Sequence, residues 1–144
     1  MSLSTIVLPL HLLTLTFLAW TILHADHLAF TWIRGKVNML KKEELKKYHK
    51  RTWIGLMGMI VTGLILFWPL REYLLTRPQF YAKMAFVVTL IVNGFVIGHL
   101  QDVATRKWFK ELTLKEKLPL FISGAVSTLA WLGAAIGGFY LLPF

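Results

Sequence analysis

The chain has 144 residues, of which 56% are hydrophobic and 14% aromatic, and it carries a formal net charge of +9. This apolar content exceeds the usual range of soluble domains. The absence of cysteine excludes disulfides, Cys-ligated iron–sulfur clusters and thioether-attached haem. The basic residues lie beside apolar blocks, so the charge does not indicate nucleic-acid binding. Composition predicts a single domain over residues 1–144 whose main partner is the lipid bilayer.

Four apolar blocks have the length that crosses a bilayer as a helix, which is about 20 residues. The predicted spans are residues 5–33, 52–70, 80–100 and 118–142. The first span is longer than a bilayer requires, so its last turns are expected to extend into the cytoplasm. Because proline stops or starts helices, span ends are expected at Pro69, Pro78 and Pro119. The predicted fold class is all-α, an integral membrane four-helix bundle.

The basic residues also predict an orientation. Thirteen of the sixteen Lys and Arg residues lie in segments 34–51 and 106–117, which are the first and third loops. Short loops rich in Lys and Arg stay in the cytoplasm, so both termini are expected on the outer face of a bacterial inner (cytoplasmic) membrane. Trp32 and Trp108 are then expected at the inner membrane interface, where tryptophan is enriched.

Polar side chains inside the apolar blocks are the candidates for function, because a charged group at the centre of a membrane helix costs about 2.5–3.5 kcal/mol on insertion scales. They form two predicted layers, separated by about 22 Å of helix. The outer layer contains His11 and Lys83, and the inner layer contains His24, Asp26, His27 and His99. On a helical wheel Asp26 lies about 60° from His11, so both residues can line one face, and Asp26 is a candidate cofactor contact.

The inner layer is a candidate metal site. His24 and His27 are three residues apart on one helix, a spacing at which two imidazoles can share a metal ion, with His99, Asp102 or His49 completing the ligand set. The alternative is that these residues are hydrated at the membrane interface.

Asn93 is the carboxamide in the middle of the third span, and it is a candidate cofactor contact. The alternative is an interhelical hydrogen bond. Gly133 and Gly137 form a G-x-x-x-G pattern in the fourth span. Such a pattern favours close helix packing, either within the chain, in a homodimer or in a larger membrane complex.

Several of these residues together resemble a known superfamily. The pattern consists of an early histidine in the first span, a Thr-Gly pair in the second and Pro-x-Phe-x-x-Lys opening the third; here these are His11, Thr62-Gly63, Pro78, Phe80 and Lys83. The chain resembles a superfamily of small bacterial four-helix membrane proteins, mostly uncharacterised, over residues 9–100. The layout is similar to that of haem-binding protoporphyrinogen oxidase and of copper-resistance D-type domains.

The resemblance implies haem b and a redox role, either electron transfer or an oxidase-like reaction. It implies that His11 is the iron ligand and that Lys83 anchors a propionate or a substrate carboxylate. The alternative function is a non-enzymatic membrane subunit or a metal-binding module that uses His24, His27 and His99 at the cytoplasmic interface.

The orientation can be tested with reporter fusions. We expect fusions after the fourth span to be active only with a periplasmic reporter, because the basic loops stay in the cytoplasm. Fusions within segment 34–51 should be active only with a cytoplasmic reporter. A cytoplasmic C-terminus would contradict the predicted orientation.

Overall fold

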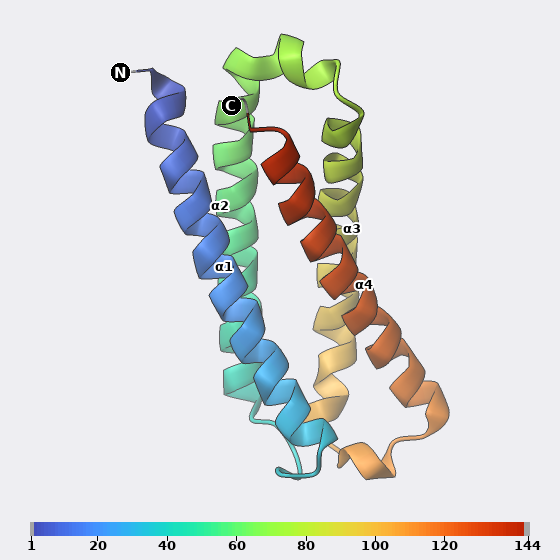
Figure 1. Cartoon of the computed structure of the whole chain (residues 1–144). Coiled ribbons are helices and arrows are strands. Elements are labelled where there is room, and N and C mark those ends of the chain that lie inside the picture. Colours follow the sequence, from blue (N-terminus) through green and yellow to red (C-terminus); the bar gives the residue numbers. More distant parts are fainter. Residues whose placement is uncertain (1, 143–144) are drawn as a thin grey trace. The chain divides into compact units, whose positions relative to one another are not determined.

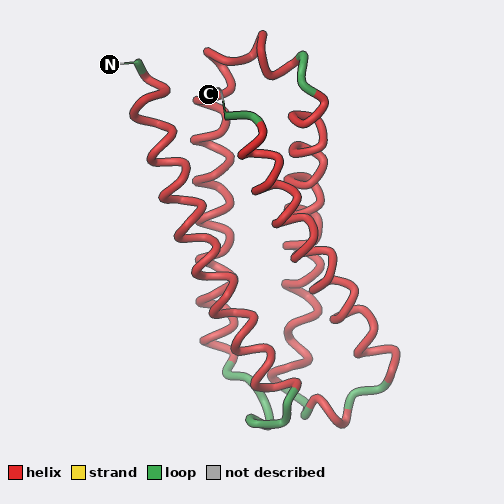
Figure 2. Tube along the Cα trace, in the orientation of Figure 1, coloured by secondary structure: helices red, strands yellow, loops and turns green. Residues whose placement is uncertain are grey.

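The computed structural model describes residues 2–142, and these residues form helices and short connections (Figure 1). The long helices are α1 (Leu3–Ile33), α2 (Lys42–Leu75), α3 (Pro78–Leu100) and α4 (Leu114–Tyr140), and two short 3₁₀ helices, η1 (Gln101–Thr105) and η2 (Phe109–Glu111), follow α3. No strand occurs within residues 2–142 (Figure 2). The all-α prediction is confirmed.

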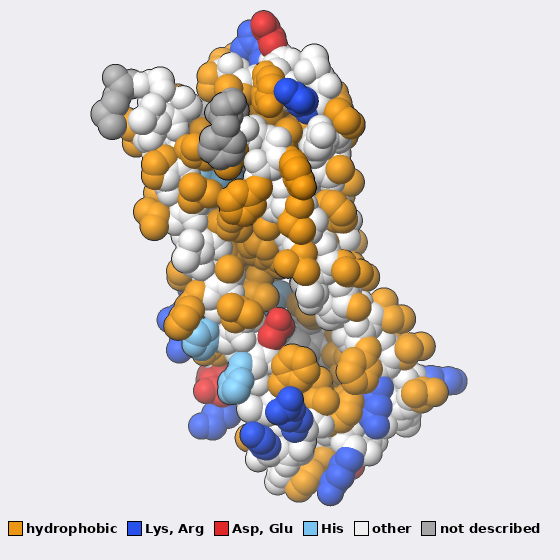
Figure 3. All heavy atoms as spheres, viewed as in Figure 1, with side chains coloured by type: hydrophobic (Ala, Val, Ile, Leu, Met, Phe, Trp, Pro, Cys, Tyr) orange, Lys and Arg blue, Asp and Glu red, His pale blue; other side chains and the backbone are white. Residues whose placement is uncertain are grey.

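The four long helices are each long and apolar enough to cross a membrane. Their middle parts expose large apolar side chains, such as Leu13 at 66%, Trp20 at 65% and Leu64 at 63%. Orange apolar side chains cover much of the face drawn in Figure 3. Exposed apolar surface of this extent needs a hydrocarbon environment, so the protein is an integral membrane protein. The orientation stays a prediction, and residues 1 and 143–144 lie outside the described residues.

Helix α2 is longer than its predicted span at both ends. It begins at Lys42 and ends at Leu75, whereas the predicted span covers residues 52–70. Glu43 and Glu44 lie in its first turn, where negative charge interacts favourably with the helix dipole. Hydropathy identifies only the apolar part of the helix, which is long enough to cross the hydrocarbon layer. The helix continues beyond this part at both ends, with charged turns at its start.

Two of the three prolines that were expected at helix ends lie inside helices. Pro78 is the first residue of α3, as predicted, but Pro69 lies inside α2 and Pro119 inside α4. A proline inside a helix removes one backbone hydrogen bond. The helices nevertheless continue past Pro69 and Pro119, so these prolines do not end or begin a helix. Both residues still lie next to the ends of the predicted apolar spans at residues 70 and 118.

The chain divides into two compact units, and each is described by itself. The first comprises residues up to Pro69 together with Gln101–Leu112, and the second comprises Leu70–Leu100 and the residues from Thr113 onward. In the first unit, α1 and the main part of α2 pack as an antiparallel pair. A Cβ atom added to Gly55 would lie 2.9 Å from Cδ1 of Leu18, and one added to Gly58 would lie 2.9 Å from Cγ2 of Thr14. These two glycines allow the helices to approach closely.

The segment that contains η1 and η2 packs on the first loop and the end of α1, within the same unit. The Leu40 amide donates to the Ala104 carbonyl at 2.8 Å, and the Trp32 indole N–H donates to the Lys107 carbonyl at 3.0 Å. The indole also meets the Phe109 ring edge-on, with the ring centres 5.2 Å apart. Trp32 is only 4% exposed, so its ring is buried under this segment, and its place at the membrane interface stays a prediction.

In the second unit, α3 and α4 pack against each other through small residues of α4. A Cβ atom added to Gly133 would lie 2.5 Å from the Phe86 ring, and one added to Gly137 would lie 3.4 Å from Cβ of Lys83. The G-x-x-x-G pattern is thus used for packing within the chain. At the start of α4, the Thr113 amide donates to the Glu116 carboxylate at 2.9 Å, which satisfies a backbone N–H that has no partner in the helix.

A substitution at Gly55 tests the packing of the first unit. Leu18 is 2% exposed, and its Cβ atom, which no rotamer change can move, would lie 3.1 Å from the added methyl group, so the Gly55→Ala variant should be destabilised by about 1–3 kcal/mol. Gly124→Ala is the matched control, because a Cβ atom there meets nothing within 4 Å. Thermal unfolding in detergent measures both variants. If Gly55→Ala is as stable as Gly124→Ala, the close approach of α1 and α2 is contradicted.

Candidate functional site

The first candidate residue, His11, is buried between α1 and α2 in the first unit. Its side chain is 8% exposed, and its Nδ1 atom lies 2.6 Å from the hydroxyl oxygen of Thr62, which is 6% exposed. The two residues are separated by 51 positions in the sequence. This hydrogen bond joins α1 and α2 within their apolar segments.

The partners of Thr62 determine which nitrogen of His11 carries the proton. The Thr62 hydroxyl donates to the Gly58 carbonyl at 2.7 Å, and the Met59 carbonyl lies 3.3 Å away. A hydroxyl has one proton to donate, so its oxygen accepts the bond from His11. The His11 imidazole therefore carries its proton on Nδ1, and in the neutral ring the lone pair that can bind a metal is on Nε2.

Gly63 lies beside the same ring. A Cβ atom added there would be 3.6 Å from Cε1 of His11, the carbon between the two ring nitrogens. The residues that carry the resemblance in the first two spans, His11 and Thr62-Gly63, are thus brought together by the structure. A buried imidazole that is oriented by a second residue and has its lone pair on Nε2 fits the donor chemistry of haem b.

Lys83 belongs to the second unit, and within it the side chain lies along α4. A Cβ atom added to Gly138 would lie 3.4 Å from Nζ of Lys83, so the ammonium group is next to the last turns of α4. The residue is half-buried. Within residues 2–142 the Lys83 side chain has no carboxylate partner. Proximity of Lys83 to His11 would join two units, and it stays a prediction.

Asn93 forms a reciprocal pair with Ser123 in the second unit. Its amide nitrogen donates to the Ser123 carbonyl at 3.0 Å, and the Ser123 hydroxyl donates to its Oδ1 atom at 2.8 Å. Asn93 is 8% exposed and Ser123 is 4% exposed. The alternative of an interhelical hydrogen bond is therefore the one that the structure supports. The sequence pattern gave no sign that Ser123 is the partner of Asn93.

The inner-layer histidines lie on the surfaces of their own units. His24 and His99 each donate from Nδ1 to a carbonyl four residues earlier in the same helix, at 2.9 Å, the acceptors being Trp20 and Phe95. His24 also contacts the Trp20 ring, with 4.4 Å between the ring centres. His24, His27 and His99 are all exposed. His24 and His27 belong to the first unit and His99 to the second, so a shared metal site stays a prediction.

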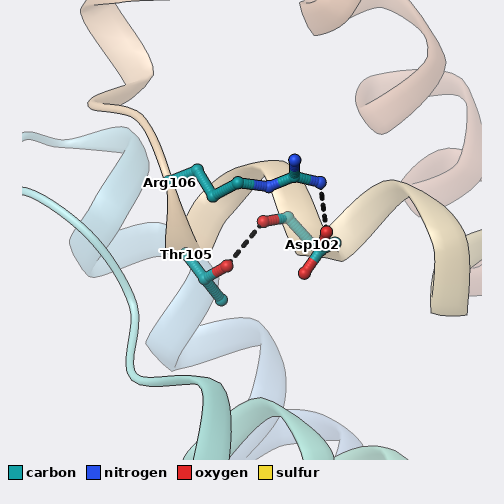
Figure 4. A network of polar contacts seen from close by, with 3 residues as sticks. All are labelled: Asp102, Thr105 and Arg106. Atoms are coloured by element: carbon teal, nitrogen blue, oxygen red, sulfur yellow. Dashed lines mark hydrogen bonds and ion pairs between the residues drawn. The ribbon is translucent and has the colours of Figure 1, made fainter.

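The two carboxylates near the inner histidines, Asp26 and Asp102, lie in different surroundings. Asp26 is exposed on α1, whereas His11 on the same helix is buried, so the two residues do not share one environment. Asp102 forms an ion pair with Arg106, and its carbonyl accepts a hydrogen bond from Thr105 at 2.7 Å (Figure 4). Within residues 2–142 no group of three or more His, Cys, Asp or Glu side chains is arranged to hold a metal ion.

Comparisons of the chain with protein-family models, with curated proteins and with solved structures give no match. The conclusions about function therefore depend on the sites themselves.

The Asn93–Ser123 pair can be tested by stability. Ser123→Ala removes the donor to Asn93 Oδ1, and this should destabilise the protein by about 0.6–1.7 kcal/mol, the range of hydrogen bonds between membrane helices. Thr128→Ala is the control, because its exposed hydroxyl bonds only to the Gly124 carbonyl of its own helix at 3.0 Å. Equal stability of the two variants in reversible unfolding would contradict the pair's role in joining α3 and α4.

Proposed function

We propose that the protein is a haem-b-binding redox protein of the bacterial inner membrane, with His11 as the iron ligand. The observation that carries the proposal is the 2.6 Å hydrogen bond between His11 and Thr62 in an apolar helix pair. A metal-binding histidine commonly donates its other ring N–H to a second residue, which fixes both the tautomer and the ring orientation. Bound haem would supply one-electron chemistry, tuned by its axial ligand and by burial.

In this proposal the residues of the chain have separate tasks. Thr62 holds the His11 ring and keeps its proton on Nδ1. Gly63 leaves space beside the ring that a larger side chain would occupy. The apolar side chains of α1 and α2 exclude water, which lowers the local dielectric constant and strengthens the polar contacts that are made there.

Lys83 is proposed to bind a carboxylate, either a propionate or an acidic group of a substrate. The support comes from its place beside Gly137 and Gly138, which have no side chains of their own to fill the space next to it. A lysine ammonium in an apolar segment is costly, which favours a functional reason for its presence. Asp26 and Asn93 are secondary candidates for cofactor contact, but the amide of Asn93 is already bonded to Ser123.

A second candidate function is a non-enzymatic membrane subunit. The observation that favours it is the Asn93–Ser123 pair, in which buried polar groups satisfy each other without a ligand. Such a subunit would join a larger complex or bind a metal ion through His24, His27 or His99. A homodimer through Gly133 and Gly137 would compete with the contacts that both glycines make to α3.

The absorption spectrum of the purified protein tests the first proposal. Protein prepared in detergent from haem-supplied cells should have a Soret band, and His11→Ala should remove it. Thr62→Val keeps the side-chain volume but loses the acceptor for Nδ1–H, so it should weaken haem binding about 10–100-fold. Titration with haem and metal analysis measure both effects.

Two matched controls separate ligation from general damage. Thr16→Val removes an exposed hydroxyl that bonds to the Leu12 carbonyl of its own helix, and His24→Ala removes an exposed imidazole. Both variants should bind haem like the wild type. A colourless wild-type protein that takes up no added haem would support the subunit alternative. Undiminished binding by His11→Ala would exclude His11 as the ligand.

A further inference from the structure

A shallow pocket lies at the C-terminal end of α1, in the first unit. It has a volume of about 140 Å³ and is lined by His27, Phe30, Thr31, Arg34 and Lys36. By the same measure one water molecule needs about 10–15 Å³, so the pocket can accept a small polar group. Its lining combines two permanent cations with an imidazole and contains no carboxylate.

The two cations are not needed to end the helix. The last carbonyls of α1 are satisfied by backbone amides: Phe30 by Arg34 at 2.9 Å, Thr31 by Lys36 at 2.9 Å and Trp32 by Gly35 at 3.0 Å. Gly35 adopts φ 71°, the left-handed conformation that allows the chain to turn here. The Arg34 and Lys36 side chains therefore do not cap the helix.

Nor do these cations have partners elsewhere in the described part of the chain. Within residues 2–142 the side chains of Arg34, Lys36 and His27 form no hydrogen bond and no ion pair. Apolar side chains are exposed beside the pocket, since Phe30 is 56% exposed and Leu23, two turns earlier in α1, is 65% exposed; Asp26, between them in the sequence, is also exposed. On the face drawn in Figure 3, pale-blue histidine side chains lie near blue Lys and Arg side chains over the lower part of α1. A cationic pocket is thus continuous with a lipid-exposed helix surface.

We propose that this pocket binds the phosphate group of an anionic membrane lipid. The Arg34 guanidinium can donate two parallel hydrogen bonds to phosphate oxygens, which a lysine cannot do. Lys36 adds a second positive charge, and Phe30 offers an apolar surface for the start of an acyl chain. The pocket lies at the end of α1 that carries the basic loop, where anionic lipids of the cytoplasmic leaflet attract Lys and Arg. The proposal is independent of haem binding.

The test is lipid binding to the full-length protein, measured by native mass spectrometry in detergent. The probes are phosphatidylglycerol, zwitterionic phosphatidylcholine and inorganic phosphate. The pocket variant is Arg34→Gln with Lys36→Gln, and both side chains are exposed, so the fold should be retained. The control variant is Lys50→Gln with Arg51→Gln, which removes the same charges from exposed positions of α2 outside the pocket.

We expect the pocket variant to bind phosphatidylglycerol about tenfold more weakly than the wild type, and the control variant to bind it like the wild type. Phosphatidylcholine binding should be the same for all three proteins. Equal weakening by both variants would overturn the proposal, because net charge alone would then explain binding. Unchanged binding by the pocket variant would also overturn it. Displacement of the lipid by inorganic phosphate at equal concentration would overturn the lipid assignment, since the acyl chains would contribute nothing.

Discussion

The absence of water around membrane helices is the constraint on which the rest of the structure depends. A polar side chain in hydrocarbon must find its partner inside the protein, because no solvent is there to replace it. The Nδ1 atom of His11 forms a hydrogen bond with the Thr62 hydroxyl oxygen at 2.6 Å, and Asn93 forms two hydrogen bonds with Ser123. Each pair joins two helices of one unit. No buried side-chain nitrogen or oxygen within residues 2–142 lacks a hydrogen-bond partner.

Close approach of the helices makes these short hydrogen bonds possible. Gly55 and Gly58 let α2 reach Leu18 and Thr14 of α1, and Gly63 lies against the His11 ring itself. In the second unit, Phe86 and Lys83 of α3 pack against glycines of α4 in the same way. Small residues and buried polar residues thus act together, since the glycines set the distance that the hydrogen bonds require. A substitution of one of these glycines should therefore weaken the hydrogen bonds between the helices, and the loss of a hydrogen bond should loosen the packing at the glycines.

Hydropathy predicted the four helices because the length of apolar sequence is set by bilayer thickness. It did not predict the charged first turns of α2 or the continuation past Pro69, because these depend on backbone hydrogen bonding. The candidate site was predicted in part: His11 and Thr62-Gly63 carried the resemblance, and the structure joins them. Ser123 and the Lys107 carbonyl were not foreseen as partners of Asn93 and Trp32, since contacts across 30 and 75 positions leave no local pattern.

The central claim is that Thr62 fixes His11 as an imidazole with its proton on Nδ1 and its lone pair on Nε2. Nitrogen-15 NMR of the purified, cofactor-free protein measures this directly, because protonated and unprotonated ring nitrogens have distinct chemical shifts. The account predicts that His11 has a protonated Nδ1 and an unprotonated Nε2, and that Thr62→Val loses this preference while Thr16→Val keeps it. A wild-type His11 with its proton on Nε2, or an equal mixture of the two tautomers, would contradict the account.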